Sequence, residues 1–138
     1  MSILVQEFHQ KFGLPDGSVD VTNNFDPKLE SDSGVLKFRF NFMREELHEF
    51  ASAALQRDKV KAFDALLDLV YVAMGTSLFM GITPEQWYDG MSAVHEANMS
   101  KMRATSTEQS KRGTTLDVVK PEGWIPPEQK LRQILGLS

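Results

Sequence analysis

Carboxylate side chains are concentrated on two neighbouring segments of this 138-residue sequence. The first segment, MREELHEF, carries Glu45, Glu46 and Glu49, which fall within about 100° of one another if the segment is helical. The second segment, DALLDLVYVAMGT, reads as a buried helix yet holds Asp64 and Asp68, and it contains no Lys, Arg or Glu. Like charges at such spacings repel one another on a helix, so another interaction must favour them.

Metal binding is the chemistry that best explains these acids. Burying an isolated carboxylate costs free energy, and buried carboxylates are therefore paired or coordinate a metal. Two antiparallel helices joined by a short break would bring the two acidic groups face to face. Ligand sets made only of oxygen favour hard cations, so the pattern predicts a site for Mg²⁺, with Mn²⁺ able to substitute. Pattern alone leaves two simpler interpretations open, a solvated acidic face for the glutamates and a polar seam between helices for the aspartates.

The elements that must position these acids are predicted to be helices. Apolar residues recur at three- and four-residue steps in most of the chain. Helices are expected at residues 4–12, 35–55, 58–80 and 83–102. Asp58 is a plausible N-cap of the third helix. Thr83, with Pro84 after it and Gln86 three residues on, predicts the start of the fourth.

The remaining segments are predicted to be irregular, apart from one short helix. Residues 13–34 are rich in turn-forming residues and are expected to form a loop of about twenty residues, a length that is often functional. Residues 104–118 are polar and expected to be mobile, KPEGWIPP to be extended around Trp124, and PEQKLRQIL to form a short last helix. We therefore predict an all-α fold, a four-helix bundle with an extended C-terminal tail. It is expected to be one domain of residues 1–138, with core helices at about 35–103 and a tail at 104–138.

Composition narrows the class of protein. The chain is 41% apolar and 25% charged, which suits one globular domain. It has no cysteine, which excludes disulfides and thiolate metal sites and fits a reducing cytosol. Its net charge of −4 argues against a generic nucleic-acid binder. We count no apolar run of transmembrane length and no signal-peptide core, so we expect a cytoplasmic protein without a membrane partner.

Histidine and the end of the fourth helix offer further candidates. His9, His48 and His95 share no metal-binding spacing, which argues against a histidine-ligated zinc. The segment VHEANMSKM places His95, Asn98 and Lys101 on a loose common face. That face is either a solvated helix end or a phosphate-binding Lys with an Asn that donates hydrogen bonds.

Five segments together resemble the all-α nucleoside triphosphate pyrophosphohydrolases. They are VQEFHQKFGLP, REELHEF, DALLDLVYVAMGT, VHEANMSKM and KPEGWIPP, and they span nearly the whole chain. The superfamily includes MazG-like proteins, dimeric dUTPases and phosphoribosyl-ATP pyrophosphohydrolase, and the chain is similar to its short, phosphoribosyl-ATP-pyrophosphohydrolase-like members often found in bacteriophages. The family's E-x-x-E motif falls on Glu46 and Glu49, and its E-x-x-D motif on Ala65 and Asp68. Because Ala65 has no carboxylate, Asp64 is expected to substitute for it.

The resemblance implies Mg²⁺-dependent hydrolysis between the α- and β-phosphates of a nucleotide, which releases a nucleoside monophosphate and pyrophosphate. Glu46, Glu49, Asp64 and Asp68 are then the expected metal ligands. Glu45 is expected to orient or deprotonate the attacking water. The expected substrate-binding residues are Phe12, His95, Asn98, Lys101, Lys120 and Trp124, with Phe25 as a further candidate for stacking on the base.

The residues and the resemblance leave more than one substrate and more than one assembly open. A phage-type enzyme, acting in the host cytoplasm, would use a deoxynucleotide such as dGTP. The alternatives are a phosphoribosyl-ATP pyrophosphohydrolase and a metal-stabilised helical interaction module without turnover. We expect a homodimer or a dimer-of-dimers tetramer, because the helices carry more apolar residues than one bundle needs. No nucleic-acid partner is expected.

Overall fold

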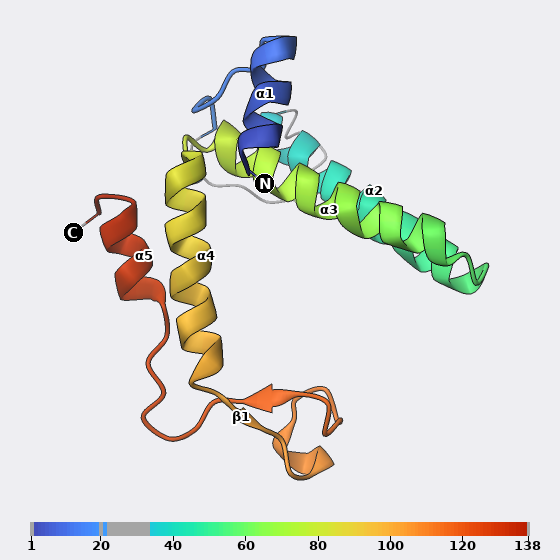
Figure 1. Cartoon of the computed structure of the whole chain (residues 1–138), viewed down its shortest axis with the longest axis vertical. Coiled ribbons are helices and arrows are strands. Elements are labelled where there is room, and N and C mark those ends of the chain that lie inside the picture. Colours follow the sequence, from blue (N-terminus) through green and yellow to red (C-terminus); the bar gives the residue numbers. More distant parts are fainter. Residues whose placement is uncertain (1, 20, 22–33, 138) are drawn as a thin grey trace. The chain divides into compact units, whose positions relative to one another are not determined.

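The computed structural model describes residues 2–19, 21 and 34–137, and these residues are mainly helical (Figure 1). The helices are α1 (Ser2–Phe12), α2 (Val35–Leu55), α3 (Lys59–Phe79), α4 (Pro84–Met99) and α5 (Glu128–Ile134), with a 3₁₀ helix, η1 (Thr107–Gln109). Two short antiparallel strands, β1 (Met102–Arg103) and β2 (Val118–Val119), pair Met102 with Val119. The predicted all-α fold with a C-terminal tail is confirmed. Most of the predicted 13–34 loop, including Phe25, lies outside the described residues.

The chain forms two compact units, Met1–Trp87 and Tyr88–Ser138, and the boundary falls within α4. The single domain expected from the sequence stays a prediction.

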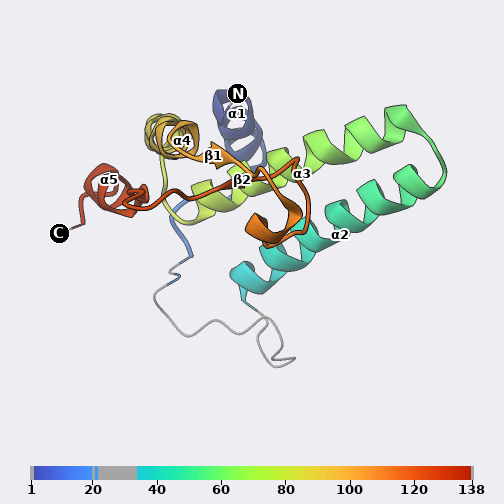
Figure 2. The same ribbon diagram turned by 90° about the horizontal axis from the view of Figure 1, so that it is seen from below.

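An antiparallel pair of long helices, α2 and α3, dominates the first unit (Figure 2). The turn between them is tight because Arg57 adopts a left-handed conformation with φ of 57°. The N–H of Arg57 then donates to the Ala54 carbonyl and that of Asp58 to the Ala53 carbonyl, each at 3.0 Å, which is the Schellman arrangement. Asp58 also caps α3 as predicted, because its carboxylate accepts from the Lys61 N–H at 3.0 Å. This turn sets the register of the two helices at one end.

The core of the first unit lies at the C-terminal half of α3. Val5 of α1 packs against Met74 and Leu78, and Trp87 is partly buried against them. The expectation that the whole of DALLDLVYVAMGT is buried was wrong. Burial is nearly continuous from Val72 onwards, whereas Asp64, Asp68 and the apolar residues between them and Tyr71 are mostly exposed. The reason is that the contacts of α1 with α3 fall on residues 71–79 and leave the preceding turns uncovered.

By length and composition alone, α3 could cross a membrane, contrary to the expectation that no segment has this character. The core helix of a globular protein meets the same two criteria. In this structure α3 packs against both α1 and α2.

The start of α4 follows the predicted capping box. The Gln86 N–H donates to the Thr83 hydroxyl at 3.1 Å, and the Thr83 N–H donates to the Gln86 side-chain oxygen at 3.0 Å. The helix ends at Met99, three residues before its predicted end, because Met102 enters β1.

In the second unit residues 104–118 have a defined arrangement, and the mobility expected of them stays a prediction. They connect β1 to β2 through η1, and Asp117 holds the connection by accepting from Ser110 Oγ at 2.8 Å and from Arg112 Nη1 at 2.9 Å. The tail then returns to α4, where Trp124 Nε1 donates to the Ala97 carbonyl at 2.8 Å. The short last helix is confirmed as α5, and its Lys130 forms an ion pair with Glu96 of α4.

Candidate active site

A single line of residues on α2 faces α3. The buried residues of α2 are Arg39, Glu46 and Ala53, which repeat at intervals of seven and therefore share one face of the helix. On α3 the buried residues of the facing half are Ala65 and Val72. Glu46 is thus the one acid among Glu45, Glu46 and Glu49 that is buried between the two helices. Ala65, which takes the place of the first acid in E-x-x-D, is also buried and lines the same groove as Ala53.

Glu46 is buried close to other negatively charged side chains. The residue is 7% exposed, and its Oε2 atom is buried with no hydrogen-bond partner among the described residues. Burial, followed by the negative charges of Glu49, Asp68 and Glu45, raises the pKa of Glu46 to about 7. An unpaired buried carboxylate oxygen of this kind requires either a proton or a cation.

The five predicted acids act on one another across the two helices. The pKa of Asp68 is also raised, by burial first and then by the charges of Asp64 and Glu49. The pKa of Glu46 is raised by the charges of Glu45, Glu49 and Asp68. These repulsions show that all five carboxylates form one cluster. The structure therefore brings together every acid to which the sequence analysis assigned a catalytic or metal-binding role.

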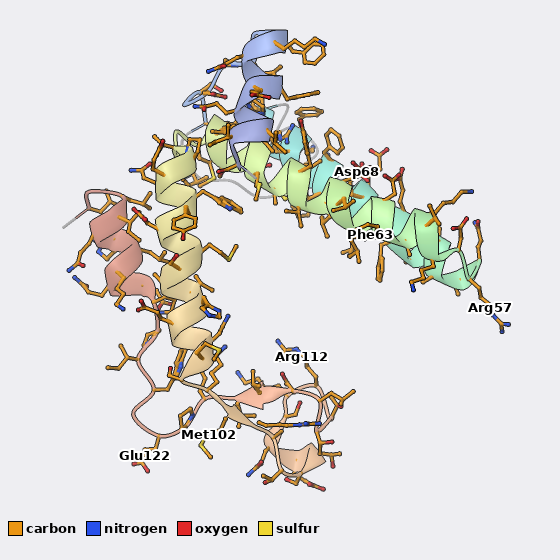
Figure 3. All side chains as sticks on the ribbon, in the orientation of Figure 1. Arg57, Phe63, Asp68, Met102, Arg112 and Glu122 are labelled. Atoms are coloured by element: carbon orange, nitrogen blue, oxygen red, sulfur yellow. The ribbon has the colours of Figure 1, made fainter. Side chains whose placement is uncertain are left out.

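An open groove of about 920 Å³ runs along α2 and α3 beside this cluster. Glu45, Glu49 and Asp64 line it, together with three basic or ionisable side chains, those of Arg44, His48 and Lys61. Asp68 and Phe63 leave α3 on different sides, so the acidic side of the helix is separate from an apolar one (Figure 3). Asp64 lies on the groove although Ala65 does not supply a carboxylate, which is the arrangement that the proposed substitution of Asp64 requires.

None of the five acids forms an ion pair with another described residue. Within the described residues, no three His, Asp or Glu side chains are gathered closely enough to enclose a metal ion as they stand. The oxygen-only donor set and the unpartnered Oε2 atom of Glu46 nevertheless suit a hard cation. The metal site stays a prediction.

The second unit contains a separate, basic pocket of about 440 Å³. Lys101 and Lys120 line it, and their ammonium groups lie 5.1 and 4.9 Å from the centre of the Trp124 ring. Lys111 and Arg112 also line it. The one carboxylate in its lining, that of Asp117, is already bound to Arg112 and Ser110, and these hydrogen bonds lower its pKa. The pocket therefore has a surplus of positive charge.

The other predicted substrate-binding residues do not line this pocket. His95 and Asn98 are exposed on α4, and neither lines the basic pocket. Phe12 is 57% exposed at the end of α1, where its ring lies 4.7 Å from that of Phe8. The structure thus brings Lys101, Lys120 and Trp124 together, and His95 and Asn98 lie outside the lining of this pocket.

Two groups of residues near the candidate sites were not predicted from the sequence. Lys111 and Arg112 join the basic pocket only because the β1–β2 pair folds residues 104–118 back, although the adjacent basic pair in SKRG was a usable signal. Arg39 is buried between α2 and α3, where it contacts Thr76 and Val72. Its signal was its position seven residues before Glu46, on a face that is otherwise apolar.

The fold and the site together define an α-helical protein whose central helix pair carries a cluster of five carboxylates beside an open groove. The family model for phosphoribosyl-ATP pyrophosphohydrolase matches residues 5–98, more than half of the chain, and the chain belongs to this family. It is therefore a pyrophosphohydrolase acting on a nucleotide, and the resemblance to the all-α pyrophosphohydrolases is confirmed. The match includes all five acids and ends before Lys101. No curated protein matches the chain significantly.

Proposed function

We propose that the protein hydrolyses a nucleoside or deoxynucleoside triphosphate between the α- and β-phosphates, with Mg²⁺ as cofactor and Mn²⁺ able to substitute. The products are a nucleoside monophosphate and pyrophosphate, and dGTP is the first substrate to test. The observation that carries the proposal is the unpartnered Oε2 atom of Glu46, which is buried among four other carboxylates in a chain of this family.

Glu46, Glu49, Asp64 and Asp68 would hold the metal, because their carboxylates come from both helices and act on one another. Bound Mg²⁺ supplies positive charge to the phosphate oxygens and makes water more acidic, as in other metal-assisted hydrolyses. Glu45 lies on the groove beside them and accepts the proton of the attacking water or orients that water. Without the cation, the acids would repel a triphosphate.

The basic pocket of the second unit supports a role in binding the phosphate tail. Lys101 and Lys120, with Lys111 and Arg112, present ammonium and guanidinium donors that form charge-assisted hydrogen bonds to phosphate oxygens. Trp124 offers a ring face for the base, and Asn98 and His95 offer hydrogen bonds from α4. Phe12 stays a candidate for stacking from the first unit.

We also propose that the protein self-associates as a homodimer or a dimer of dimers. Phe63, Leu66, Leu67 and Val70 recur on α3 at helical spacing and are 42–62% exposed, which leaves a continuous apolar stripe. Exposed apolar patches of this kind mark interaction surfaces, and a second copy of the same stripe is self-complementary across a twofold axis. Light scattering should give at least the dimer mass, and Leu67→Glu should reduce it. A wild-type monomer with full activity would contradict the proposal.

The test of the activity is a nucleotide panel with Mg²⁺, in which pyrophosphate and the monophosphate are both measured. Phosphoribosyl-ATP belongs in the panel because the family model carries its name. If phosphoribosyl-ATP is hydrolysed and the triphosphates are not, the alternative substrate replaces the proposed one. If no nucleotide yields pyrophosphate with either metal, the proposed function is wrong.

Variants of the acids test the assigned roles. Asp68→Asn and Glu49→Gln keep the side-chain shape and should each reduce turnover by orders of magnitude, because an amide is a poor ligand for the ion. Asp64→Asn should resemble Asp68→Asn if Asp64 replaces the acid absent at Ala65. Near-normal turnover and metal affinity of Asp64→Asn would show instead that Asp64 is not a ligand. Glu122→Gln, an exposed change in the second unit, is the matched control.

A further inference from the structure

Arg39 is a buried cation without an anionic partner among the described residues. Arg39 is 6% exposed, and no described carboxylate lies within 4.0 Å of its guanidinium nitrogens. Its Nε donates to the Thr76 hydroxyl at 3.2 Å, and its Nη2 donates to the Val72 carbonyl at 2.9 Å. The Thr76 hydroxyl in turn donates to the same carbonyl at 2.8 Å. These polar partners all lie on α3, so Arg39 ties α2 to α3 through hydrogen bonds.

The surroundings of Arg39 keep the guanidinium in place. Three rings lie 5.0–5.5 Å from its central carbon, those of Phe38, Phe42 and Phe79. A Cβ atom at Gly75 would lie 2.8 Å from Arg39 Nη2 and 3.0 Å from His9 Nε2. His9 is itself buried, and its Nδ1 lies 2.6 Å from Asp16 Oδ1. The close approach of Arg39 to α3 therefore depends on the absence of a side chain at Gly75.

The position of this tie relates it directly to the acids. Glu46 follows Arg39 by seven residues on the same face of α2, which is about 10.5 Å along the helix axis. Asp68 precedes Thr76 by eight residues on α3, which is about 12 Å. Because the helices are antiparallel, both steps lead in the same direction, and they bring Glu46 and Asp68 opposite each other, where the charge of Asp68 raises the pKa of Glu46.

The acids cannot hold this arrangement by themselves. The negative charges of Glu45, Glu46, Glu49, Asp64 and Asp68 repel one another, which favours separation of the two helices. The turn at Arg57 and Asp58 sets the register at one end of the pair. Arg39 sets it at the other end, and the acidic cluster lies between the two.

We propose that Arg39, held by Thr76 and Val72 and admitted by Gly75, is a positioning residue that sets the register of α2 on α3 and so places Glu46 opposite Asp68. It lies two helical turns from Glu46 and is itself buried. The consequence for turnover rests on the proposed function, whereas the consequence for the distance between residues 46 and 68 does not.

Activity and metal affinity provide the first test. Arg39→Met keeps most of the side-chain length and removes the donors, and Thr76→Val removes the hydroxyl with little change of shape. Both should lower kcat about 10- to 100-fold, because a misplacement of about 1 Å has effects of this size. Both should also weaken Mn²⁺ binding in calorimetry. Thr76→Ser restores the hydroxyl and should restore both quantities, and Gly75→Ala should act like Arg39→Met without altering Arg39 itself.

A stability control separates positioning from general destabilisation. Leu78→Ala removes core contacts with Val5 and Met74 and leaves the hydrogen bonds of Arg39 in place. At a temperature where circular dichroism shows all variants folded, Leu78→Ala should retain wild-type kcat and Mn²⁺ affinity. If Arg39→Met and Thr76→Val retain them as well, or if Leu78→Ala loses them equally, the inference is wrong.

A chemical test works even if the protein proves to have no turnover. The chain has no cysteine, so a double variant with Glu46→Cys and Asp68→Cys contains only the two introduced thiols. Under mild oxidation this pair should form an intramolecular disulfide, and the rate should fall at least several-fold when Arg39→Met is added. Equal rates in the two backgrounds would overturn the inference, whereas failure of the nucleotide panel alone would overturn only the proposed function.

Discussion

Glu46→Gln should stabilise the metal-free protein, and its effect should grow with pH. The glutamine keeps the shape of the protonated glutamate and removes the one negative charge that α2 buries against α3. Such a gain from altering a site residue is expected where function requires an arrangement that is unfavourable for folding. The reason here is electrostatic, because Glu46 is surrounded by other acids.

The size of the effect follows from the pKa of Glu46. Burial and neighbouring charges raise it from 4.5 to about 7, and each pH unit of difference corresponds to 1.36 kcal/mol. Below pH 4.5 the side chain is protonated in both the folded and unfolded states, and its burial carries no penalty from charge. Between pH 4.5 and 7 the folded state binds the proton more tightly, so stability is lost as pH rises. Above pH 7 the cost reaches about 3 kcal/mol.

Urea denaturation with a chelator present, followed by circular dichroism at pH values from 5 to 9, measures this dependence. The free energy of unfolding of Glu46→Gln should exceed that of the wild type by about 3 kcal/mol at pH 8 and by much less at pH 5. The exposed change Glu122→Gln should follow the wild type throughout. If wild type and Glu46→Gln give parallel curves between pH 5 and 8, the charge of Glu46 is not the destabilising element.

Addition of Mg²⁺ should reduce the difference in stability between the two proteins. A ligand that binds only the folded state stabilises it by an amount that grows with the logarithm of its affinity, and Glu46→Gln lacks a carboxylate that would bind the ion. The wild type should therefore gain more stability from Mg²⁺ or Mn²⁺ than the variant does. An equal gain for both proteins would remove Glu46 from the set of metal ligands.

Three further predictions concern the elements around the site. Arg57→Gly should raise the free energy of unfolding by about 1 kcal/mol in urea titrations, because Arg57 has a φ of 57° that glycine adopts without strain. Thr83→Ala should lower it by about 1 kcal/mol through loss of the cap on α4, and Thr83→Ser should not. Trp124→Phe should loosen the tail by removing the hydrogen bond to Ala97, and limited proteolysis after residue 120 should then be faster than in the wild type.

The sequence by itself determined the elements whose ends depend on local chemistry. The bounds of α2 were predicted as Val35 to Leu55, and the caps Asp58 and Thr83 were found in the predicted roles. These features depend on residues within one or two turns, so their signals are present in short windows of sequence. The acidic cluster was also predictable, because two successive antiparallel helices leave few ways to arrange the acids on them.

Only the tertiary structure decided which acids are buried and which are not. The sequence does not distinguish Glu45, Glu46 and Glu49 from one another. In the structure Glu46 lies on the face of α2 that packs against α3 and is buried, whereas Glu45 and Glu49 line the groove. The expectation of a fully buried DALLDLVYVAMGT failed for the same reason, since burial depends on where α1 lies. Arg39 could not be recognised as a tie between helices until Gly75 was seen opposite it. Such contacts join residues more than thirty positions apart, and their free energy depends on packing and desolvation that no short window of sequence contains.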